Sequence, residues 1–465
     1  MSLCSLNKRP FEREKYFRIK RNHQPLQTAN PNVYICAQTL CILEHLLFAA
    51  YLIFFAWLVT KTKFFTASGL NSPQLVIVFL LKVMAGILYG WIGVHYELLA
   101  QMGDTWGYHY NSLQEYHVLL TNPKIFFTDI FHNSYEDGYT RFLATENSWW
   151  NDLKGNVIIK LLALFDVFSF GNYYINVIFY SFISLFGPLA FYRVMKDVFP
   201  SRKLPILLAI FLAPSVLYWT SGLHKDGLVF FAFCWIVYHI YFGLKNRFTG
   251  RRILAIFLGL LLVLVMRNFL IIPLLPALFA WILADRLKKK PLIVFCAVYA
   301  LFVLLFFTAK FINPRLNFPE GVVERQEAFL KLGGGSAVAV NKLEPTFTSF
   351  LVNAPQAFAL STIRPYPSDV HHLLSLAASL EINFLLLLFL LFLWRHKKIK
   401  AFDPFLLFCV FFSLSVLMMI GYSVDVLGAI VRYRSIVLSF LIVPMVAQTD
   451  WDKIGRLFFG NSEKD

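Results

Sequence analysis

Apolar stretches long enough to cross a membrane recur along the chain from Tyr34 to Gln448, and this recurrence limits the fold more than any other feature of the sequence. About 20 residues of α-helix cross the hydrocarbon core of a bilayer, so the pattern predicts an all-α integral membrane protein with about 11–12 hydrophobic helices. The composition agrees, because 15% of the 465 residues are charged, against about 25% in an average soluble domain. The hydrophobic segments are 34–60, 73–93, 157–170, 172–195, 205–220, 227–244, 253–266, 268–285, 291–309, 373–394, 403–421 and 433–448.

Two polar stretches, 94–156 and 310–371, interrupt the hydrophobic pattern. We expect them to form larger loops that carry short interfacial helices. The segment 157–170 is too short to span a bilayer and contains Lys160 and Asp166, which suits a helix lying along the membrane interface.

The first 30 residues are polar and basic, without the short apolar core and small-residue cleavage site of a secretory signal peptide. We therefore expect the first hydrophobic helix to act as an uncleaved signal anchor. The chain divides into a basic cytoplasmic N-terminal segment (1–33), a polytopic transmembrane domain (34–448) and a cytoplasmic C-terminal tail (449–465). The six cysteines are scattered and show neither metal-ligand spacing nor a disulfide framework.

Basic residues cluster in short segments beside the hydrophobic helices, which accounts for the formal net charge of +16. This distribution follows the positive-inside rule and argues against nucleic-acid binding. The sequence "SGLHKDG" (221–227) and the stretches 310–371 and 421–434 are predicted to meet on the face opposite the basic loops. The basic loops predicted on the cytoplasmic side are 245–252, 285–290 and 395–400.

The side of the membrane taken by 94–156 has two interpretations. Counting every segment as a span from a cytoplasmic N-terminus places this stretch inside. Its composition favours the outside, because it holds eight acidic but only three basic residues, and scarce Lys and Arg are typical of external loops. Counting and composition agree if one early segment does not span the membrane and 157–170 lies along the interface, and we favour the outside.

Asp104 follows a glycine just beyond a hydrophobic segment, and Trp106, Tyr108, His109 and Tyr110 come directly after it. Partial desolvation near the membrane boundary is expected to raise the pKa of this carboxylate, which suits a general base acting on a hydroxyl. The neighbouring rings offer flat faces to a sugar, and His109 offers a polar contact. The alternative is an interfacial aromatic belt with an ordinary helix-capping aspartate.

Glu136 and Asp137 stand side by side before a glycine in the polar loop. Paired carboxylates can bind a divalent cation together with substrate phosphates, which makes them candidates for substrate binding and for a divalent cation as cofactor. An Asp-Gly pair in a polar loop is more often a simple turn.

His224, Lys225 and Asp226 lie between two hydrophobic segments, where ionisable residues are costly and usually face a partner or a wet cavity. Pro214 predicts a kink in the approach, and a lysine and a histidine side by side suit a phosphate. The alternative is a plain hairpin turn with a solvated Lys-Asp pair.

Arginines provide further candidates for anion binding. Arg364 precedes a Pro-Tyr-Pro segment, and Arg432 and Arg434 begin the last hydrophobic span, all on the predicted outer face where the positive-inside rule does not explain them. Arg267 marks either the tip of a tight hairpin or a buried cation. Arginine favours bidentate recognition of phosphate or carboxylate, so these residues together predict a cationic cavity for a lipid-linked phosphate or diphosphate.

The stretch 317–342 combines an amphipathic helix with a Gly-Gly-Gly-Ser hinge. Glu324, Arg325 and Glu327 are interpreted as a salt-bridged helix surface. A mobile lid over the cavity is an alternative role for the stretch as a whole.

The first polar loop, with its Gly-Asp pair at Asp104 and the nearby Tyr-His pair at His109, resembles the first external loop of the GT-C superfamily. These integral-membrane glycosyltransferases use polyprenyl-phosphate-linked sugars. The pieces "PSVLYWTSGLHKDG" (214–227), "IRPYP" (363–367) and "IVRYR" (430–434) are similar to motifs in bacterial membrane proteins of cell-surface polysaccharide assembly. The resemblance implies that Asp104 is the catalytic base and that the protein is a multi-pass protein of the bacterial inner membrane.

The leading hypothesis is therefore a glycosyltransferase that works on lipid-linked substrates at the outer leaflet. Its expected partners are a polyprenyl-linked glycan donor, a saccharide or lipid-linked acceptor, and membrane lipid. A polymerase that joins lipid-linked repeat units would use the same parts. The rival class is a transporter or flippase for a glycolipid or anionic solute, for which internal repeats and broken helices at the membrane midplane are typical.

Overall fold

A computed structural model describes residues 31–96, 103–140, 142, 148–288, 290–396 and 403–454 of the chain. The chain forms two compact units, Met1–Ala50 and Tyr51–Asp465, and the contacts described below lie within the second.

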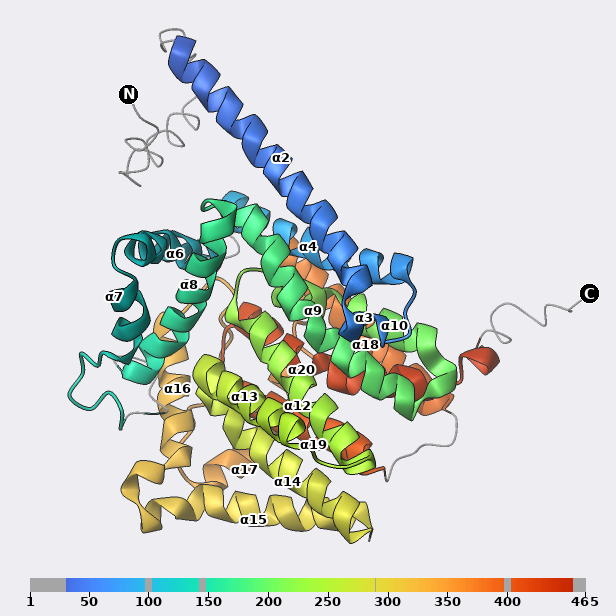
Figure 1. Ribbon diagram of the computed structural model, residues 1–465. Helices are drawn as coiled ribbons and strands as arrows, with labels where there is room; N and C mark the ends of the chain where they lie inside the picture. Colours follow the sequence, from blue (N-terminus) through green and yellow to red (C-terminus); the bar gives the residue numbers. More distant parts are fainter. Residues whose placement is uncertain are drawn as a thin grey trace, which may run out of the picture. The chain divides into compact units, whose positions relative to one another are not determined.

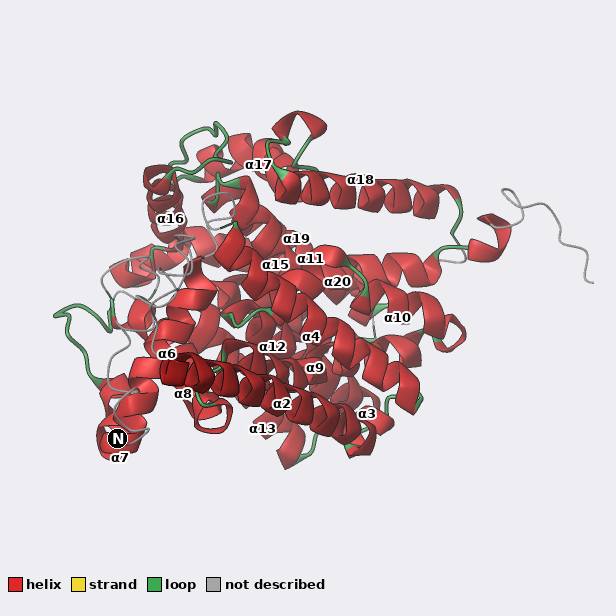
Figure 2. Ribbon diagram, turned by 90° about the horizontal axis from the view of Figure 1, so that it is seen from above, coloured by secondary structure: helices red, strands yellow, loops and turns green. Residues whose placement is uncertain are grey.

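Helices make up nearly all of the described chain, and two isolated bridges are its only β-type pairings (Figures 1 and 2). This confirms the predicted all-α class, and each of the twelve predicted hydrophobic segments falls on one or two helices. The α-helices are α2 (Pro31–Lys61), α3 (Lys63–Thr66), α4 (Ser72–His95), α6 (Gly103–Thr121), α7 (Pro123–Thr128), α8 (Trp149–Ser169), α9 (Tyr173–Val198), α10 (Lys203–Phe211), α11 (Pro214–Ser221), α12 (Lys225–Lys245), α13 (Gly250–Arg267), α14 (Ile271–Leu287), α15 (Pro291–Ile312), α16 (Phe318–Leu332), α17 (Phe347–Thr362), α18 (Leu373–Trp394), α19 (Pro404–Ser423) and α20 (Leu427–Gln448).

Several helices begin where the sequence provides an N-cap and a proline. Asn71 accepts a hydrogen bond from the backbone N–H of Gln74 (2.9 Å), whose side chain accepts one from the backbone of Asn71 (3.0 Å), so a capping box starts α4. At α19, the side chain of Asp403 accepts a hydrogen bond from the backbone N–H of Phe405 (2.9 Å), and Pro404 takes the first helical position. Such caps fix the helix ends, and with them the positions of the loops that carry the polar residues.

Nine helical stretches of the described chain are long and apolar enough to cross a membrane. The pair Pro200–Phe211 and Pro214–Ser221, bent by 56°, adds a tenth if it is counted as one span. Helix α8 is not among them. The nine stretches are Ile42–Lys61, Ser72–His95, Tyr173–Val198, Lys225–Lys245, Gly250–Leu287, Pro291–Ile312, Leu373–Trp394, Pro404–Ser423 and Leu427–Gln448.

The stretch Gly250–Leu287 folds back on itself. Its 38 residues would reach about 57 Å as one straight helix, far more than the roughly 30 Å of a bilayer core. The guanidinium of Arg286, near its end, lies 6.0 Å from the ring of Phe248, just before its start. Helices α13 and α14 are therefore a hairpin that turns at the short 3₁₀ helix Asn268–Leu270, which follows Arg267.

The predicted basic loops gather at one end of the helices, which we call the basic end. Lys245 pairs with Asp197 at the end of α9 (2.5 Å), and Arg286 reaches the α12–α13 connection as described above. The backbone N–H of Asp450 donates to the carbonyl of Arg395 (2.9 Å), and Asp452 lies 3.5 Å from Arg202, close to Asp197 in the chain. Residues 289, 397–402 and 1–30 lie outside the described residues.

The other end, which we call the site end, brings together the three stretches expected to meet there. Val338 donates its backbone N–H to the carbonyl of Asp425 (3.0 Å), and Tyr422 donates its hydroxyl to the carbonyl of Phe350 (2.7 Å). The stretch 94–156 is here too, because Trp106 donates its indole N–H to the carbonyl of Gly90 at the end of α4 (2.9 Å). Both long polar stretches thus belong to one end of the protein.

Candidate functional site

The triplet predicted as a phosphate-binding turn forms the start of α12. Helix α11 ends at Ser221, His224 is extended, and the helix begins at Lys225. A Cβ added to Gly227 would lie 2.4 Å from the carbonyl oxygen of Thr220, so a glycine is required for the first turn of α12 to approach the end of α11. The hydroxyl of Tyr180 donates to the carbonyl of His224 and holds the turn from α9.

Asp226 is completely buried and lies at the centre of an ion cluster. One carboxylate oxygen accepts a hydrogen bond from Arg267 at the end of α13. The other lies 2.8 Å from Nε of Arg432 on α20 and 3.0 Å from Nδ1 of His224. A buried charge persists only with such partners, so Asp226 fixes both arginines and the imidazole in place.

Asp104, in the first turn of α6, extends this cluster to the surface. Its carboxylate lies 3.1 Å and 3.2 Å from the two terminal nitrogens of Arg432 and 3.4 Å from Nε2 of His224, while 53% of the side chain is exposed. The hydrogen bond from His224, with the charge of Arg432, holds the pKa of Asp104 well below its ordinary value. The expected rise by desolvation was wrong, because these two partners outweigh burial.

The Asp104 carboxylate is therefore ionised, whereas burial, followed by the charge of Arg432, lowers the pKa of His224 and favours its neutral form. The pair offers a negative oxygen at the surface and a neutral imidazole behind it. A carboxylate stabilised in this way is a weak base, and it becomes a better proton acceptor for a hydroxyl when its interaction with Arg432 or His224 is weakened.

A cavity of about 120 Å³ opens beside Asp104. Five basic side chains from five different helices line it, together with one carboxylate, one tyrosine and three further residues. The lining residues are Asp104, Lys154, Lys225, Met266, Arg267, Asn268, Phe269, Arg325, Arg432 and Tyr433.

The basic residues of the cavity fall into two groups. Arg267 and Arg432 are paired with Asp226 and Asp104. Lys154, Lys225 and Arg325 form no ion pair among the described residues. We call these three the unpaired cations.

The unpaired cations come from α8, α12 and α16. The ammonium of Lys225 lies 5.5 Å from the ring of Tyr108, and the guanidinium of Arg325 stacks 3.7 Å from the ring of Phe269. Burial, reinforced by the neighbouring arginines, lowers the pKa of Lys154 to about 8, which leaves it mostly protonated at neutral pH. Such a concentration of positive charge in a confined space suits an anion.

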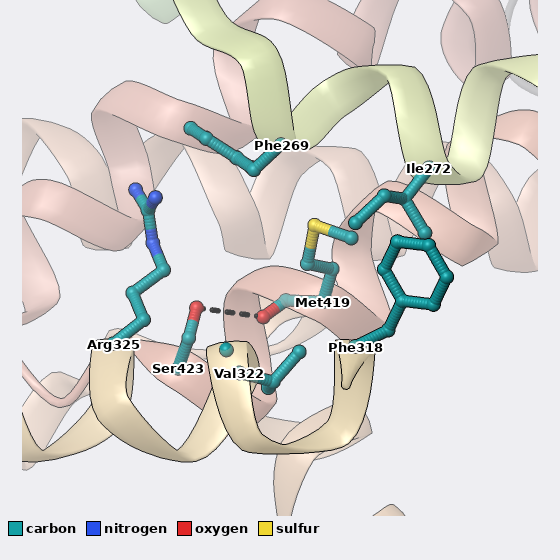
Figure 3. A pocket seen from close by; sticks show the side chains of 8 residues that line it. Phe269, Ile272, Phe318, Val322, Arg325, Met419 and Ser423 are labelled. Atoms are coloured by element: carbon teal, nitrogen blue, oxygen red, sulfur yellow. Dashed lines mark hydrogen bonds between the residues drawn. The ribbon is translucent and has the colours of Figure 1, made fainter. Parts of the chain in front are cut away.

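An apolar cleft of about 20 Å³ adjoins the cavity and shares Phe269 and Arg325 with it. Figure 3 shows Ile272 of α14, Met419 of α19 and Phe318 of α16 around this cleft, with Phe269 and the Arg325 guanidinium toward one side. The wall that separates charged from apolar space is thus one stacked Phe-Arg pair.

The structure brings together six of the predicted site residues: Asp104, His224, Lys225, Asp226, Arg267 and Arg432. They come from four segments that are far apart in the sequence, and the site-end arrangement of these segments joins them.

Two of the other predicted residues face away from the cavity. His109, expected to bind substrate, is buried against the rings of Trp106 and Tyr173. It lies five residues after Asp104 in α6, or about 140° around the helix, so the two cannot share a face. Arg434 is buried and donates to the carbonyl of Arg364. It lies two positions after Arg432, which turns it by about 200° around the helix.

The remaining three lie outside the cavity lining as well. Arg364 pairs with Asp369 of its own loop (3.4 Å). Glu136 and Asp137 are exposed in a turn, where the carbonyl of Asp137 accepts from Thr140. Among the described residues, no group of three or more Asp, Glu, His or Cys side chains is placed to hold a metal ion.

Lys154 and Arg325 are the basic residues of the cavity that sequence reasoning missed. Arg325 was expected in a salt-bridged helix surface, but it stacks on Phe269 instead of pairing with a carboxylate. Lys154 follows two tryptophans at the polar start of α8, where a lysine is unremarkable. No local signal separates either residue from a solvated one.

Comparison with known protein families, with characterised proteins and with solved structures finds no match to this chain.

Proposed function

We propose that this protein is a membrane glycosyltransferase whose donor is a sugar linked to a lipid through phosphate, as in the GT-C superfamily that its sequence resembles. The observation that carries the proposal is a cavity lined by five cations with the half-exposed carboxylate of Asp104 at its edge. Cations in a confined, poorly solvated space stabilise a leaving phosphate, and a carboxylate beside them accepts the proton of the attacking hydroxyl.

In the proposed reaction, the acceptor hydroxyl attacks the anomeric carbon of the donor sugar. The bond between that carbon and the phosphate oxygen breaks, the lipid phosphate leaves with the bonding electrons, and the hydroxyl proton passes to Asp104. Without a donor, Arg432 and His224 stabilise the Asp104 carboxylate and make it a weak base. A donor phosphate that engages Arg432 takes over part of this interaction and raises the basicity of Asp104.

The expected location is the inner membrane of a bacterium, with the site end at the outer leaflet. The expected role is assembly of a cell-surface glycan. The apolar cleft beside the cavity supports a lipid-linked donor, because it offers the first carbons of a lipid chain an apolar surface next to the phosphate site.

A transporter or flippase for a glycolipid is the second candidate. The bent pair α10–α11 favours it, because broken helices that end at a binding site are typical of transporters. Transport needs no proton acceptor at Asp104, so the two functions respond differently to its replacement.

The test uses cells from which the protein has been deleted, complemented with wild type, Asp104→Asn or Asp137→Asn at matched expression. We expect the deletion to accumulate an unfinished lipid-linked glycan, Asp104→Asn to fail to clear it, and the exposed Asp137→Asn control to clear it. If Asp104→Asn restores the wild-type glycan pool, Asp104 is not the base and transport becomes the better explanation. Whether single sugars or whole repeat units accumulate distinguishes a transferase from a polymerase.

A further inference from the structure

We infer that the cavity binds a diphosphate, two linked phosphates, rather than a single phosphate. The inference rests on the proposed function and narrows its donor to a lipid-linked diphosphate. Three observations support it: the charge left over in the cavity, the space available, and the apolar cleft beside it.

The first observation is the charge of the cavity. Arg267 and Arg432 are neutralised by Asp226 and Asp104, which leaves Lys154, Lys225 and Arg325 without a carboxylate among the described residues. The buried Nε of Arg325 has no hydrogen-bond partner in the part of the chain that the structure describes. A phosphate monoester carries about two negative charges at pH 7, since its second pKa is about 6. The donor diphosphate, esterified at both ends, carries about one negative charge on each phosphate. The lipid diphosphate that leaves has one ester link and carries about one charge more than a phosphate monoester, which matches the three unpaired cations.

The second observation is the size of the cavity. A single water needs at least about 10–15 Å³ of such volume, so a cavity of about 120 Å³ has room for roughly eight to twelve groups of that size. A diphosphate group has nine non-hydrogen atoms and a phosphate has five. The larger group fills the cavity, whereas the smaller one leaves part of its cationic wall uncontacted.

The third observation concerns the source of the diphosphate. Arg325 and Phe269 line both the cationic cavity and the apolar cleft, whose other walls include Ile272, Phe318 and Met419 (Figure 3). A diphosphate attached directly to an apolar chain matches this succession of charged and apolar surface. A nucleoside diphosphate would instead present a polar ribose to the cleft.

Binding to the purified full chain in nanodiscs tests the inference, with inorganic phosphate and inorganic diphosphate as probes. We expect diphosphate to bind at least about tenfold more tightly, because one additional charged hydrogen bond contributes about 1.5–3 kcal/mol. Lys154→Gln and Arg325→Gln are each expected to weaken the binding of diphosphate at least about tenfold and the binding of phosphate much less. The exposed residues Lys124 and Lys331, the latter on the same helix as Arg325, provide controls as Lys124→Gln and Lys331→Gln, which should change neither affinity.

Equal affinity for phosphate and diphosphate would overturn the inference while leaving an anion site for the proposed function. Failure of both probes to bind would count against the inference and the proposed function together. Competition against labelled diphosphate then distinguishes a lipid-linked diphosphate from a nucleoside diphosphate. Stronger displacement by farnesyl diphosphate than by uridine diphosphate supports the lipid-linked donor. The reverse order would overturn the lipid assignment.

Discussion

The guanidinium of Arg432 contacts Asp104, His224 and Asp226 at once, so one side chain joins the buried part of the site to its exposed part. A phosphate that reaches the cavity competes with Asp104 for this group. Ligand binding is thus an exchange of anions around Arg432, and the basicity of Asp104 depends on what else the arginine binds.

Lys154 gives the anion site a pH dependence in the alkaline range. Its pKa of about 8 is set by burial and by the charges of Arg325 and Arg267, against a smaller opposing effect of Asp152. The lysine is protonated below this value and loses its charge as the pH rises through it, so its contribution to anion affinity is present at pH 7 and lost by pH 9. A bound anion raises the pKa of Lys154, so in the complex the lysine loses its charge at a higher pH.

We therefore expect the ratio of diphosphate affinities between wild type and Lys154→Gln to be at least about tenfold at pH 7 and to narrow toward unity by about pH 9 to 10. Comparing the two proteins cancels the titration of the diphosphate itself. Dissociation constants at pH 7, 8, 9 and 10 provide the measurement, and a constant ratio would show that Lys154 does not contact the anion.

Sequence reasoning found site residues where an ionisable group interrupts apolar sequence. Asp226, Arg267 and Arg432 stand out because a charge at membrane depth is costly without a partner. Arg434 is also an arginine at the start of a hydrophobic span, so the sequence does not distinguish it from Arg432. The two differ only because they lie on different faces of α20. Arg325 gave no signal, because an arginine on an amphipathic helix is ordinary until the helix is placed against Phe269.

At the scale of the helices, close backbone approach sets how the site end is assembled. Helix α17, in the second polar stretch, packs directly on α19, and a Cβ added to Gly421 would lie 1.9 Å from the carbonyl oxygen of Ala357. The existence of these helices follows from hydrophobic length and caps, which are local properties. Their contacts depend on non-local fit, which the sequence pattern does not contain.

Gly421→Ala is expected to separate α17 from α19 and to destabilise the protein by about 1–3 kcal/mol, as overpacked cores do. The controls are Gly107→Ala in α6 and Gly155→Ala in α8, where an added Cβ meets nothing within 4 Å and a small gain is expected from helix propensity. The stabilities of the three variants are compared by the denaturant concentration at the midpoint of unfolding, measured in detergent. An unchanged midpoint for Gly421→Ala would show that α17 is free to move away from α19.

At the scale of the molecule, the charge pattern separates the two ends. The basic loops 245–252, 285–290 and 395–400 were predicted to share one side, and the contacts of Lys245, Arg286 and Arg395 place their described parts together. Counting alternate membrane crossings is sufficient to predict that these loops share a side, because the count uses only the positions of the hydrophobic segments in the sequence. The same count does not determine on which side of the membrane 94–156 lies, because the answer depends on whether 157–170 crosses the membrane.

We expect the site end to face the outside of the cell. In a cysteine-free background, Lys124→Cys, at the site end, should react with a membrane-impermeant thiol reagent on intact cells. Arg251→Cys, at the basic end, should react only after the membrane is permeabilised. Labelling of both positions from the same side would contradict the two-ended arrangement. If Arg251→Cys reacted on intact cells and Lys124→Cys only after permeabilisation, the site would face the cytoplasm.

The α13–α14 hairpin has a consequence for how the protein is made. Arg267 sits at its tip and finds its carboxylate on the preceding helix, so a nascent α13 released alone into lipid would carry an unneutralised guanidinium. Helices α12 to α14 are therefore expected to leave the translocation channel as a group, with Asp226 and Arg267 already joined. The ion pair at the centre of the site would then be among the first tertiary contacts formed during biosynthesis.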